Sequence, residues 1–353
     1  MQSSIPIRAQ RNMQPISLLL GMLLTSIASL ATADPTATSP YIVSVFATAP
    51  SGLSQPDSIV KWHDSVIVGY ENHAAKDGSA GSSTIVEYSL KGKVKNSYTV
   101  PGHNDGLRIV GENHLWALQN EDANPNLVVI DLRWGTQHLY KFPATPHGGG
   151  YDDIVVKNGG VYLTASNPNL NAQGVNVFPA LVRATLAGDS VILETVFNGD
   201  APAINITTGA TTTLNLTDPD SMTVDPSGNI VFVSQADSEL VFVRHPFRAD
   251  QTIGLLPLSA PNGAVITIDD TAFAPAGSVA LLVTDIGTGV IYRIERPSFG
   301  FEIGTAYSAS DTLGLVGTLN VDTGFVSPVV TGMNSARGLV FLTDEDHEEH
   351  GQE

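Results

Sequence analysis

Short runs of alternating apolar and polar residues follow one another along most of the chain, with turn residues between them. In the stretch 220–234, an aspartate precedes a short apolar run, a Pro-Ser-Gly turn and a second, strongly alternating run. A period of two is typical of half-buried β-strands. No helical unit separates these runs, so the pattern predicts an all-β chain.

The outline of this stretch recurs at intervals of about 40 to 50 residues, one interval being longer. Repeats of this length made of short strands are typical of propeller blades. We therefore expect a β-propeller of six four-stranded antiparallel blades over residues 41–343, whose ring is closed by the N-terminal strand 41–47. Each repeat begins with an acid, and the leading acids are Asp57, Asp105, Asp152, Asp220, Asp270 and, more weakly, Asp311.

The last two repeats admit more than one division into blades. The first division gives the fifth blade the runs 271–274, 278–284, 290–295 and 301–308, and the sixth blade 313–319, 325–331 and 338–343. The second division starts from the likeness of residues 333–339 to residues 53–59, and a seventh, partial blade follows from it. Only the first division gives the lone strand 41–47 a place, which favours it. The Thr-rich segment 198–217 is predicted to be an inserted hairpin.

The two ends of the chain differ from the repeats. Arg8 and Arg11 precede an apolar run and an Ala-Thr-Ala sequence, which predicts a signal peptide over residues 1–33. A retained membrane anchor is the alternative. Residues 34–40 are predicted to be a linker and residues 344–353 an acidic, disordered tail. His347 and His350 in this tail are a metal-binding pair or, in the alternative, part of a solvated end. We expect a secreted or periplasmic protein.

The composition restricts the partners. The chain has 35 Asp and Glu against 17 Lys and Arg, a formal net charge of −18. Nucleic acids and anionic membranes bind basic surfaces, so neither is expected as a partner, and no membrane contact is expected after signal cleavage. We expect a monomer that binds a small molecule or an exported protein. The chain has no Cys, so stability must come from a large core and ring closure rather than from disulfides.

The leading acids are predicted to meet on one face. The first strand of each blade lines the central channel. The loop that carries each acid enters its first strand on the same face of the ring. Crowded carboxylates need protons, hydrogen bonds or a cation, and Ca²⁺ prefers six to eight such oxygens. The sequence therefore predicts a Ca²⁺ site among Asp57, Asp105, Asp152, Asp220 and Asp270. In the alternative, each Asp accepts backbone N–H bonds from the next blade.

Two histidines are predicted to lie in the loops that enter first strands. His103 and His147 precede Asp105 and Asp152, and they are the candidates for a general base, with solvated loop histidines as the alternative. The sequence has no Gly-x-Ser-x-Gly, no phosphate-binding Gly-Lys-Thr/Ser loop and no His-Glu-x-x-His. The same face should also receive side chains from the loops that follow second strands, which are Glu71, Asn72, His73, Asn120, Glu121, Asp122, Asn167, Gln235, Asp237 and Asp285.

The stretches 220–233 and 283–294 resemble the six-bladed propellers of the SMP-30/gluconolactonase, calcium-dependent phosphotriesterase and NHL-repeat group. Streptogramin-lyase-like propellers are a more distant likeness. The resemblance implies a Ca²⁺ over the channel that polarises a lactone or phosphoester. It leads to two hypotheses, a Ca²⁺-dependent hydrolase of lactones or phosphoesters and a non-catalytic, exported scaffold that binds a ligand or protein.

Overall fold

The computed structural model describes residues 34–344, and within this range the chain forms 27 strands and no helix. The predicted all-β architecture is therefore confirmed. The predicted signal peptide 1–33 and the tail residues 345–353, which include His347 and His350, lie outside the described residues. Among residues 34–344 no helix that could span a membrane is found.

The strands form five hydrogen-bonded sheets. The first sheet has the order β3-β4-β5-β6, with β3 Pro56–Trp62, β4 Ser65–Tyr70, β5 Ser82–Ser89 and β6 Val94–Pro101. The eight-stranded sheet joins two runs of four strands through one parallel pair, Lys141 with Ser190. These runs are β7 Asn104–Val110, β8 His114–Gln119, β9 Asn126–Asp131 and β10 Thr136–Lys141, then β11 Ile154–Lys157, β12 Gly160–Thr164, β13 Pro179–Ala187 and β14 Ser190–Asn198.

The remaining sheets have six, five and four strands. The six-stranded sheet has the order β16-β15-β20-β19-β18-β17, with β15 Pro202–Asn205, β16 Thr211–Thr213, β17 Pro219–Val224, β18 Ile230–Ser234, β19 Glu239–Arg244 and β20 Thr252–Pro257. The five-stranded sheet has the order β1-β26-β25-β24-β21, with β1 Thr36–Ala37, β21 Thr271–Phe273, β24 Ala306–Ser310, β25 Leu315–Asn320 and β26 Phe325–Thr331. The last sheet has the order β2-β23-β22-β27, with β2 Ile42–Thr48, β22 Ser278–Asp285, β23 Val290–Glu295 and β27 Ala336–Thr343.

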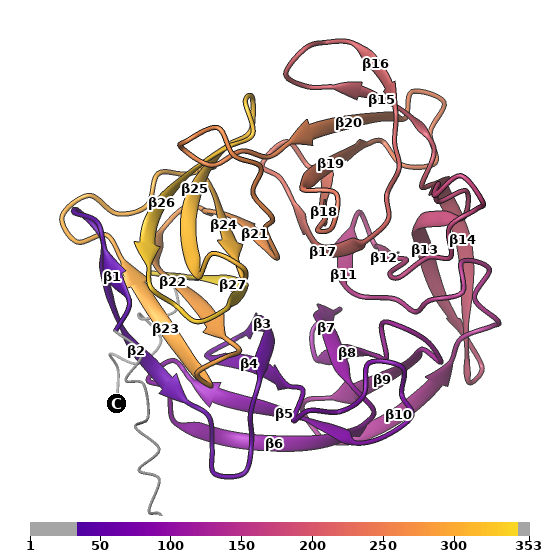
Figure 1. The fold of residues 1–353 in the computed structure, drawn as a ribbon. Coiled ribbons are helices and arrows are strands. Elements are labelled where there is room, and N and C mark those ends of the chain that lie inside the picture. The colour runs from indigo at the N-terminus through magenta and orange to yellow at the C-terminus, as the bar shows by residue number, and fades with distance from the viewer. Residues whose placement is uncertain (1–33, 345–353) are drawn as a thin grey trace, which may run out of the picture. The chain divides into compact units, whose positions relative to one another are not determined.

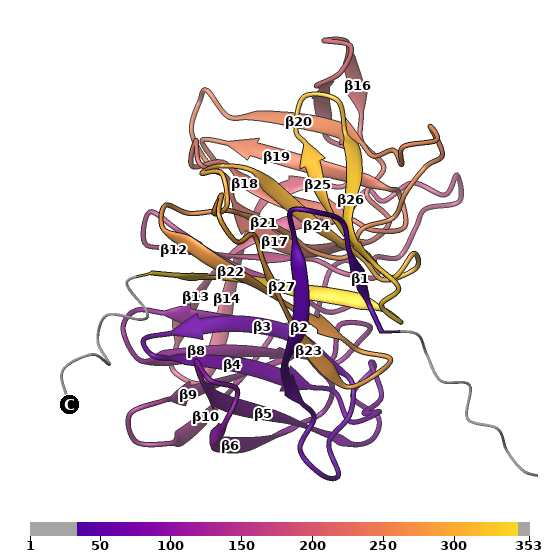
Figure 2. The same ribbon diagram turned by 90° about the vertical axis from the view of Figure 1, so that its left-hand side faces the viewer.

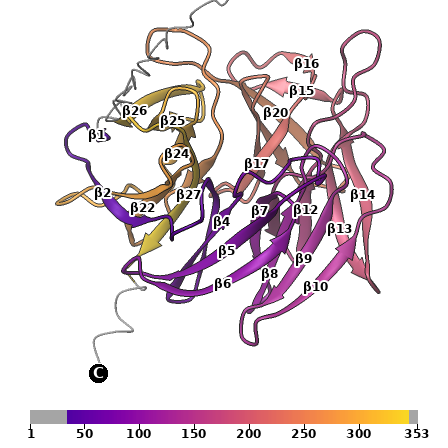
Figure 3. The same cartoon turned by 60° about the horizontal axis from the view of Figure 1, so that its bottom comes forward.

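Within residues 34–344 the sheets radiate from a common centre, as Figure 1 shows. The strands nearest the centre are β3, β7, β11, β17, β21 and β27. Residues of five of them, together with Asp152 and Asp153 just before β11, line one central cavity. We call these six the inner strands. The tilted view in Figure 3 shows how β5, β6, β8, β9 and β10 extend outward from them. The arrangement is that of a propeller.

The predicted partners of several late strands were wrong. The runs 278–284 and 290–295 were expected in one blade with 271–274, but β22 and β23 pair with β27 and β2. β21 pairs instead with β24, which begins after β23. The chain thus crosses to the neighbouring sheet at the turn 275–277 and returns later. Alternation marks where strands occur but carries no information on which strand is the partner.

The N-terminal strand completes the last sheet, although its neighbour differs from the expected one. β2 pairs with β23, not with residues 338–343. Figure 2 shows β1 and β2 together at the outer side of the sheets that contain β26 and β23. β1, which lies in the predicted linker 34–40, pairs with β26. The segment 198–217 contains β15 and β16, which pair as the expected hairpin and join β20.

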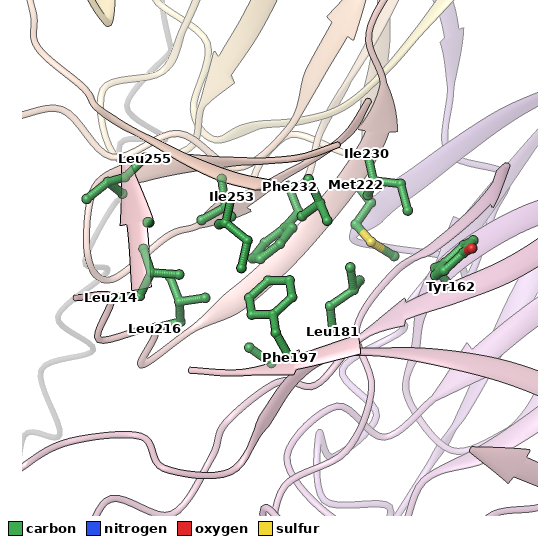
Figure 4. Packing of buried hydrophobic residues seen from close by; sticks show 14 of the residues in the cluster. Tyr162, Leu181, Phe197, Leu214, Leu216, Met222, Ile230, Phe232, Ile253 and Leu255 are labelled. Carbon is green, nitrogen blue, oxygen red and sulfur yellow. The ribbon is translucent and has the colours of Figure 1, made fainter. Parts of the chain in front are cut away.

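The core lies between neighbouring sheets. Apolar residues from β11–β14 and β15–β20 form one buried cluster, shown in Figure 4 with Phe197 and Phe232 near its centre. Their rings stack at a centroid distance of 6.2 Å. Each sheet is apolar on both faces, so burial of its faces requires a neighbour on each side. This packing fixes the inner strands and the side chains that they carry toward the centre.

Candidate functional site

A β-bulge occurs at the same place in every inner strand. In β3, β7, β17 and β27, two residues oppose one on the partner strand, between the pairs that flank the bulge. Just before β11, Thr164 exchanges backbone hydrogen bonds with Asp152 and Asp153 in the same way. Just before β21, Ala309 does so with Asp269 and Asp270. A bulge re-aims the side chain of its first residue. The first bulge residues, called here the ring positions, are Asp57, Asp105, Asp152, Asp220, Asp269 and Arg337.

All six ring positions line one cavity of about 380 Å³. Its wall also includes Lys76, Glu121, Asp122, Asn167 and Gln235 from the loops. All five predicted ligands line the cavity, and four of them, Asp57, Asp105, Asp152 and Asp220, hold ring positions. The loop residues Glu121, Asp122, Asn167 and Gln235 also lie where the sequence predicted them.

Asp270 occupies a different position from the other predicted acids. It is the second bulge residue of β21, and its two carboxylate oxygens accept the backbone N–H groups of Thr271 at 2.6 Å and Leu339 at 2.7 Å. Asp153 does the same for Met222 in the neighbouring sheet at 2.7 Å. The alternative interpretation, an Asp that bonds the backbone of the next inner strand, thus describes Asp270. The ring position belongs to Asp269, which the sequence analysis missed.

Arg337 divides the ring into two halves. Its Nη1 lies 3.2 Å from Oδ1 of Asp269 and 3.7 Å from Oδ2 of Asp57. Its Nη2 lies 3.9 Å from Oδ2 of Asp311, the weak sixth acid of the repeat. The carboxylate of Asp269, and after it that of Asp57, raises the pKa of Arg337. On this half of the ring, the protein itself supplies the cation.

The opposite half is rich in carboxyl groups, and its cation is the ammonium of Lys76, which pairs with Glu121. One oxygen of each of Asp105, Glu121 and Asp152 lies within 4.8 Å of the others, and all three residues are buried. Burial, followed by repulsion from Glu121, raises the pKa of Asp105, and burial followed by Asp220 raises that of Asp152. Burial and the nearby Asp218 raise the pKa of Asp220 to about 8. Near neutral pH, these groups hold protons unless a cation replaces them.

Glu121 is the charged member of this group. Burial acts to raise its pKa, but the ammonium of Lys76, a hydrogen bond with Asp152 and the nearby His103 together lower the pKa to about 2. Lys76 and Glu121 form an ion pair across the cavity wall. Lys76 belongs to the loop 71–81 between β4 and β5. Nothing in its composition distinguished Lys76, because its role depends on contact with another loop.

His103 lies behind Asp105 rather than in the cavity. Its Nδ1 donates to the carbonyl oxygen of Ala74 at 3.0 Å, which leaves Nε2 as the unprotonated nitrogen of the neutral ring. Nε2 lies 3.5 Å from Oδ2 of Asp105 and 3.7 Å from Oε1 of Glu71. Burial lowers the pKa of His103 and raises that of Glu71 to about 9. Since His103 is only 2% exposed, it can position Asp105 but cannot reach a solute.

His147 lies away from the cavity as well. The side chain is fully buried, Nε2 donates to the carbonyl oxygen of Gly150 at 2.6 Å, and the ring packs against the edge of Tyr151. Burial lowers the pKa of His147, which favours the neutral ring. His147 does not line the cavity. Its contacts fit a role in shaping the loop 147–150, not the role of general base predicted for it.

Comparisons with known proteins give structural neighbours only. No protein-family model and no curated protein matches the chain. Solved structures that resemble it include a candidate gluconolactonase (TM-score 0.46, 12% identity, 84% of this chain and 83% of that chain). Virginiamycin B lyase from Staphylococcus aureus also resembles it (TM-score 0.48, 13% identity, 86% and 100%). A further neighbour is a protein of unknown function from Bacteroides caccae (TM-score 0.48, 9% identity, 83% and 88%).

The first two neighbours are the kinds of propeller that the sequence resembles. Their TM-scores of 0.46 and 0.48 and identities of 12% and 13% carry no conclusion about activity. The fold follows from this chain's own strand pairing, and the site from its own side chains.

Proposed function

We propose that the acidic half of the ring binds a divalent cation and that Asp105, Glu121 and Asp152 are its protein ligands. The spacing of their oxygens carries this proposal. Two oxygens that share one Ca²⁺ at about 2.4 Å each lie up to about 4.8 Å apart, which is the limit within which these three oxygens lie. In addition, Oδ2 of Asp105 is buried and has no hydrogen-bond partner among residues 34–344.

The donor set favours Ca²⁺. All three ligands are carboxylates, the cavity supplies amide oxygens from Asn167 and Gln235, and the chain has no Cys. Hard oxygen ligands without nitrogen or sulfur suit Ca²⁺ rather than zinc. His103 faces Asp105 from outside the cavity, with Nε2 3.5 Å from Oδ2 of Asp105.

The hydrolase proposal assigns the cavity to a lactone or phosphoester. A bound cation supplies Lewis acidity toward the substrate's carbonyl or phosphoryl oxygen. Asp220 lines the cavity beside Asp152, and with its raised pKa it is placed to hold or move a proton. Lys76 neutralises Glu121 until the cation binds. In this proposal each inner strand and its three neighbours form one of six blades, and the N-terminal strand completes the last.

One observation favours the second candidate function, a non-catalytic binding scaffold. Neither histidine that the sequence offered as a base lines the cavity. Under either function we propose export, directed by residues 1–33, and a monomer whose partner is a small molecule or an exported protein. The net charge of −18 supports a partner other than nucleic acid.

A paired experiment tests both functions. Thermal unfolding is followed with chelator and with added Ca²⁺, and lactones and phosphotriesters are then screened for turnover. Ca²⁺-dependent stability together with Ca²⁺-dependent turnover supports the hydrolase, and Ca²⁺-dependent stability alone supports the scaffold. If chelator changes neither quantity, the cation proposal is wrong.

A further inference from the structure

A second cavity, of about 580 Å³, lies at the other end of the inner strands. It is formed where the β11–β12 turn, the β17–β18 turn and the connection from β19 to β20 meet. Asp152 precedes β11, and Lys157, which lines the second cavity, ends this strand. Five residues of strand span roughly 16 Å. The second cavity is therefore separate from the ring and its proposed cation.

The charge of this cavity is opposite to that of the chain. Its basic lining residues are Lys157, Arg183, Arg244 and Arg248, joined by His245, and no Asp or Glu lines it. The whole chain has 17 basic and 35 acidic side chains. These basic side chains, grouped in an otherwise acidic protein, favour the binding of an anion in this cavity.

Two of the four cations already have carboxylate partners outside the cavity. Arg183 pairs with Glu194, and Nε of Arg248 lies 3.4 Å from Oδ1 of Asp250. Lys157 and Arg244 have no ion-pair or hydrogen-bond partner for their side chains among residues 34–344. The uncompensated charge of the cavity is thus that of two cations, which matches a ligand with two negative charges.

The connection that carries His245 is held in an unusual backbone conformation. His245 has a φ of 49° and Phe247 a φ of 64°, a region that bulky side chains seldom occupy. The Oε1 of Gln251 accepts the backbone N–H of Phe247 at 2.8 Å and holds this shape. Strain of this kind clusters at ligand sites, where the surrounding structure over-determines it.

The same connection fixes one of the guanidinium groups. Arg183 lies over the ring of Phe247, with Cζ 4.4 Å from the ring centroid, and Phe247 in turn stacks with Tyr162. Tyr162 lies at the edge of the buried cluster in Figure 4. The guanidinium is therefore placed before any ligand arrives, which reduces the entropy lost on binding.

We propose that this cavity binds a phosphate-monoester dianion. Arg183, Arg244 and Arg248 present planar guanidinium groups whose paired N–H donors match phosphate oxygens, and Lys157 adds a point charge. Tyr162 gives the cavity an apolar wall for the organic part of the ester. This binding site does not depend on the cation or on the reaction proposed for the ring.

Calorimetric titration of the full chain tests the proposal, with phenyl phosphate and inorganic phosphate as probes. Chelator is present throughout, so no cation in the ring can hold the phosphate. We expect saturable one-to-one binding by the native chain. Lys157→Gln and Arg244→Gln should each weaken binding about tenfold, the value of one lost charged hydrogen bond. Arg244→Lys keeps the charge but loses the paired donors, so its effect should be intermediate.

Two controls keep the test specific. Arg133→Gln removes an exposed cation from the β9–β10 turn, and Asp105→Asn changes the ring; both should bind the probes within about twofold of the native chain. Melting temperatures verify that every variant is folded. The proposal is overturned if the native chain binds neither probe saturably, if Arg133→Gln loses as much as Arg244→Gln, or if Asp105→Asn abolishes binding.

Discussion

The guanidinium of Arg337 lies 3.2 Å from the carboxylate of Asp269, and the two residues hold the same bulge position on neighbouring inner strands. One repeat thus carries a cation where the other five carry an acid. As a result, Asp57, Asp269 and Asp311 share one guanidinium cation supplied by the protein. The acids on the opposite half, centred on Asp105 and Asp152, are left for a cation from solution.

Replacement of Arg337 by Met should destabilise the protein strongly. The buried carboxylates of Asp57 and Asp269 lose their cation, and breaking such a pair costs about 3–5 kcal/mol. Denaturant unfolding at pH 7 measures the loss. The loss should shrink near pH 5, because protonation removes the unpaired charges. An Arg337→Met variant as stable as the native chain would show that this half of the ring needs no guanidinium.

Asp269 and Asp270 should differ although they are adjacent. Asp270→Asn replaces an oxygen that accepts a backbone N–H, so we expect a loss of about 1–3 kcal/mol and unchanged Ca²⁺ affinity. Asp269→Asn removes a carboxylate partner of Arg337, so its loss of stability should come from the broken ion pair. Unfolding and calorimetry on both variants measure the difference. Weaker Ca²⁺ binding by Asp270→Asn would restore Asp270 to the ligand set.

The stability of the metal-free protein should fall as pH rises. Burial raises the pKa of Glu71 to about 9 and that of Asp220 to about 8, whereas an unfolded carboxyl titrates near about 4. Between these values the folded protein holds protons that the unfolded chain has released. The contribution of these groups is therefore fully present below about pH 4 and lost as pH approaches 8 to 9.

Melting temperatures measured in chelator from pH 5.5 to 8.5 check this dependence. Added Ca²⁺ should flatten the curve, because the cation replaces the protons of the ring. A melting temperature that rises through this range in chelator would mean that burial does not raise the pKa of Glu71 and Asp220.

The unexpected strand order can be tested by cross-linking, since the chain has no Cys of its own. Leu282 of β22 is paired with Val340 of β27. We expect the double variant Leu282→Cys/Val340→Cys to form a disulfide in the folded protein. The matched control, Ala272→Cys/Leu282→Cys, joins the two runs that the sequence placed in one blade and should stay reduced. The reverse result would restore the sequential order.

Sequence periodicity predicted the strands and the repeat because both depend on residues near one another in the chain. It placed Asp57, Asp105, Asp152 and Asp220 correctly around one cavity for the same reason. It chose Asp270 instead of Asp269 because two adjacent acids look alike until the bulge assigns each a direction. Arg337 was missed because the repeat is marked by leading acids, although residues 333–339 resemble residues 53–59.

The roles of Lys76, His103 and the exchanged strands depend on contacts between distant segments. Lys76 meets Glu121 from another loop, and the buried His103 donates to the carbonyl oxygen of Ala74, which also lies in another loop. Alternation and spacing carry no information on such contacts. The turn 275–277 is also short and ordinary in composition, so nothing in it predicted a crossing between sheets.

Calcium titration of the full chain at pH 7.5 tests the central claim most directly. The native chain should bind one Ca²⁺ with release of protons, since Asp105 and Asp152 are protonated without it. The double variant Asp105→Asn/Asp152→Asn should lose this binding, while Asp270→Asn, with the same change of charge at one residue, should retain it. Absence of saturable Ca²⁺ binding by the native chain, or its survival in the double variant, would contradict the account.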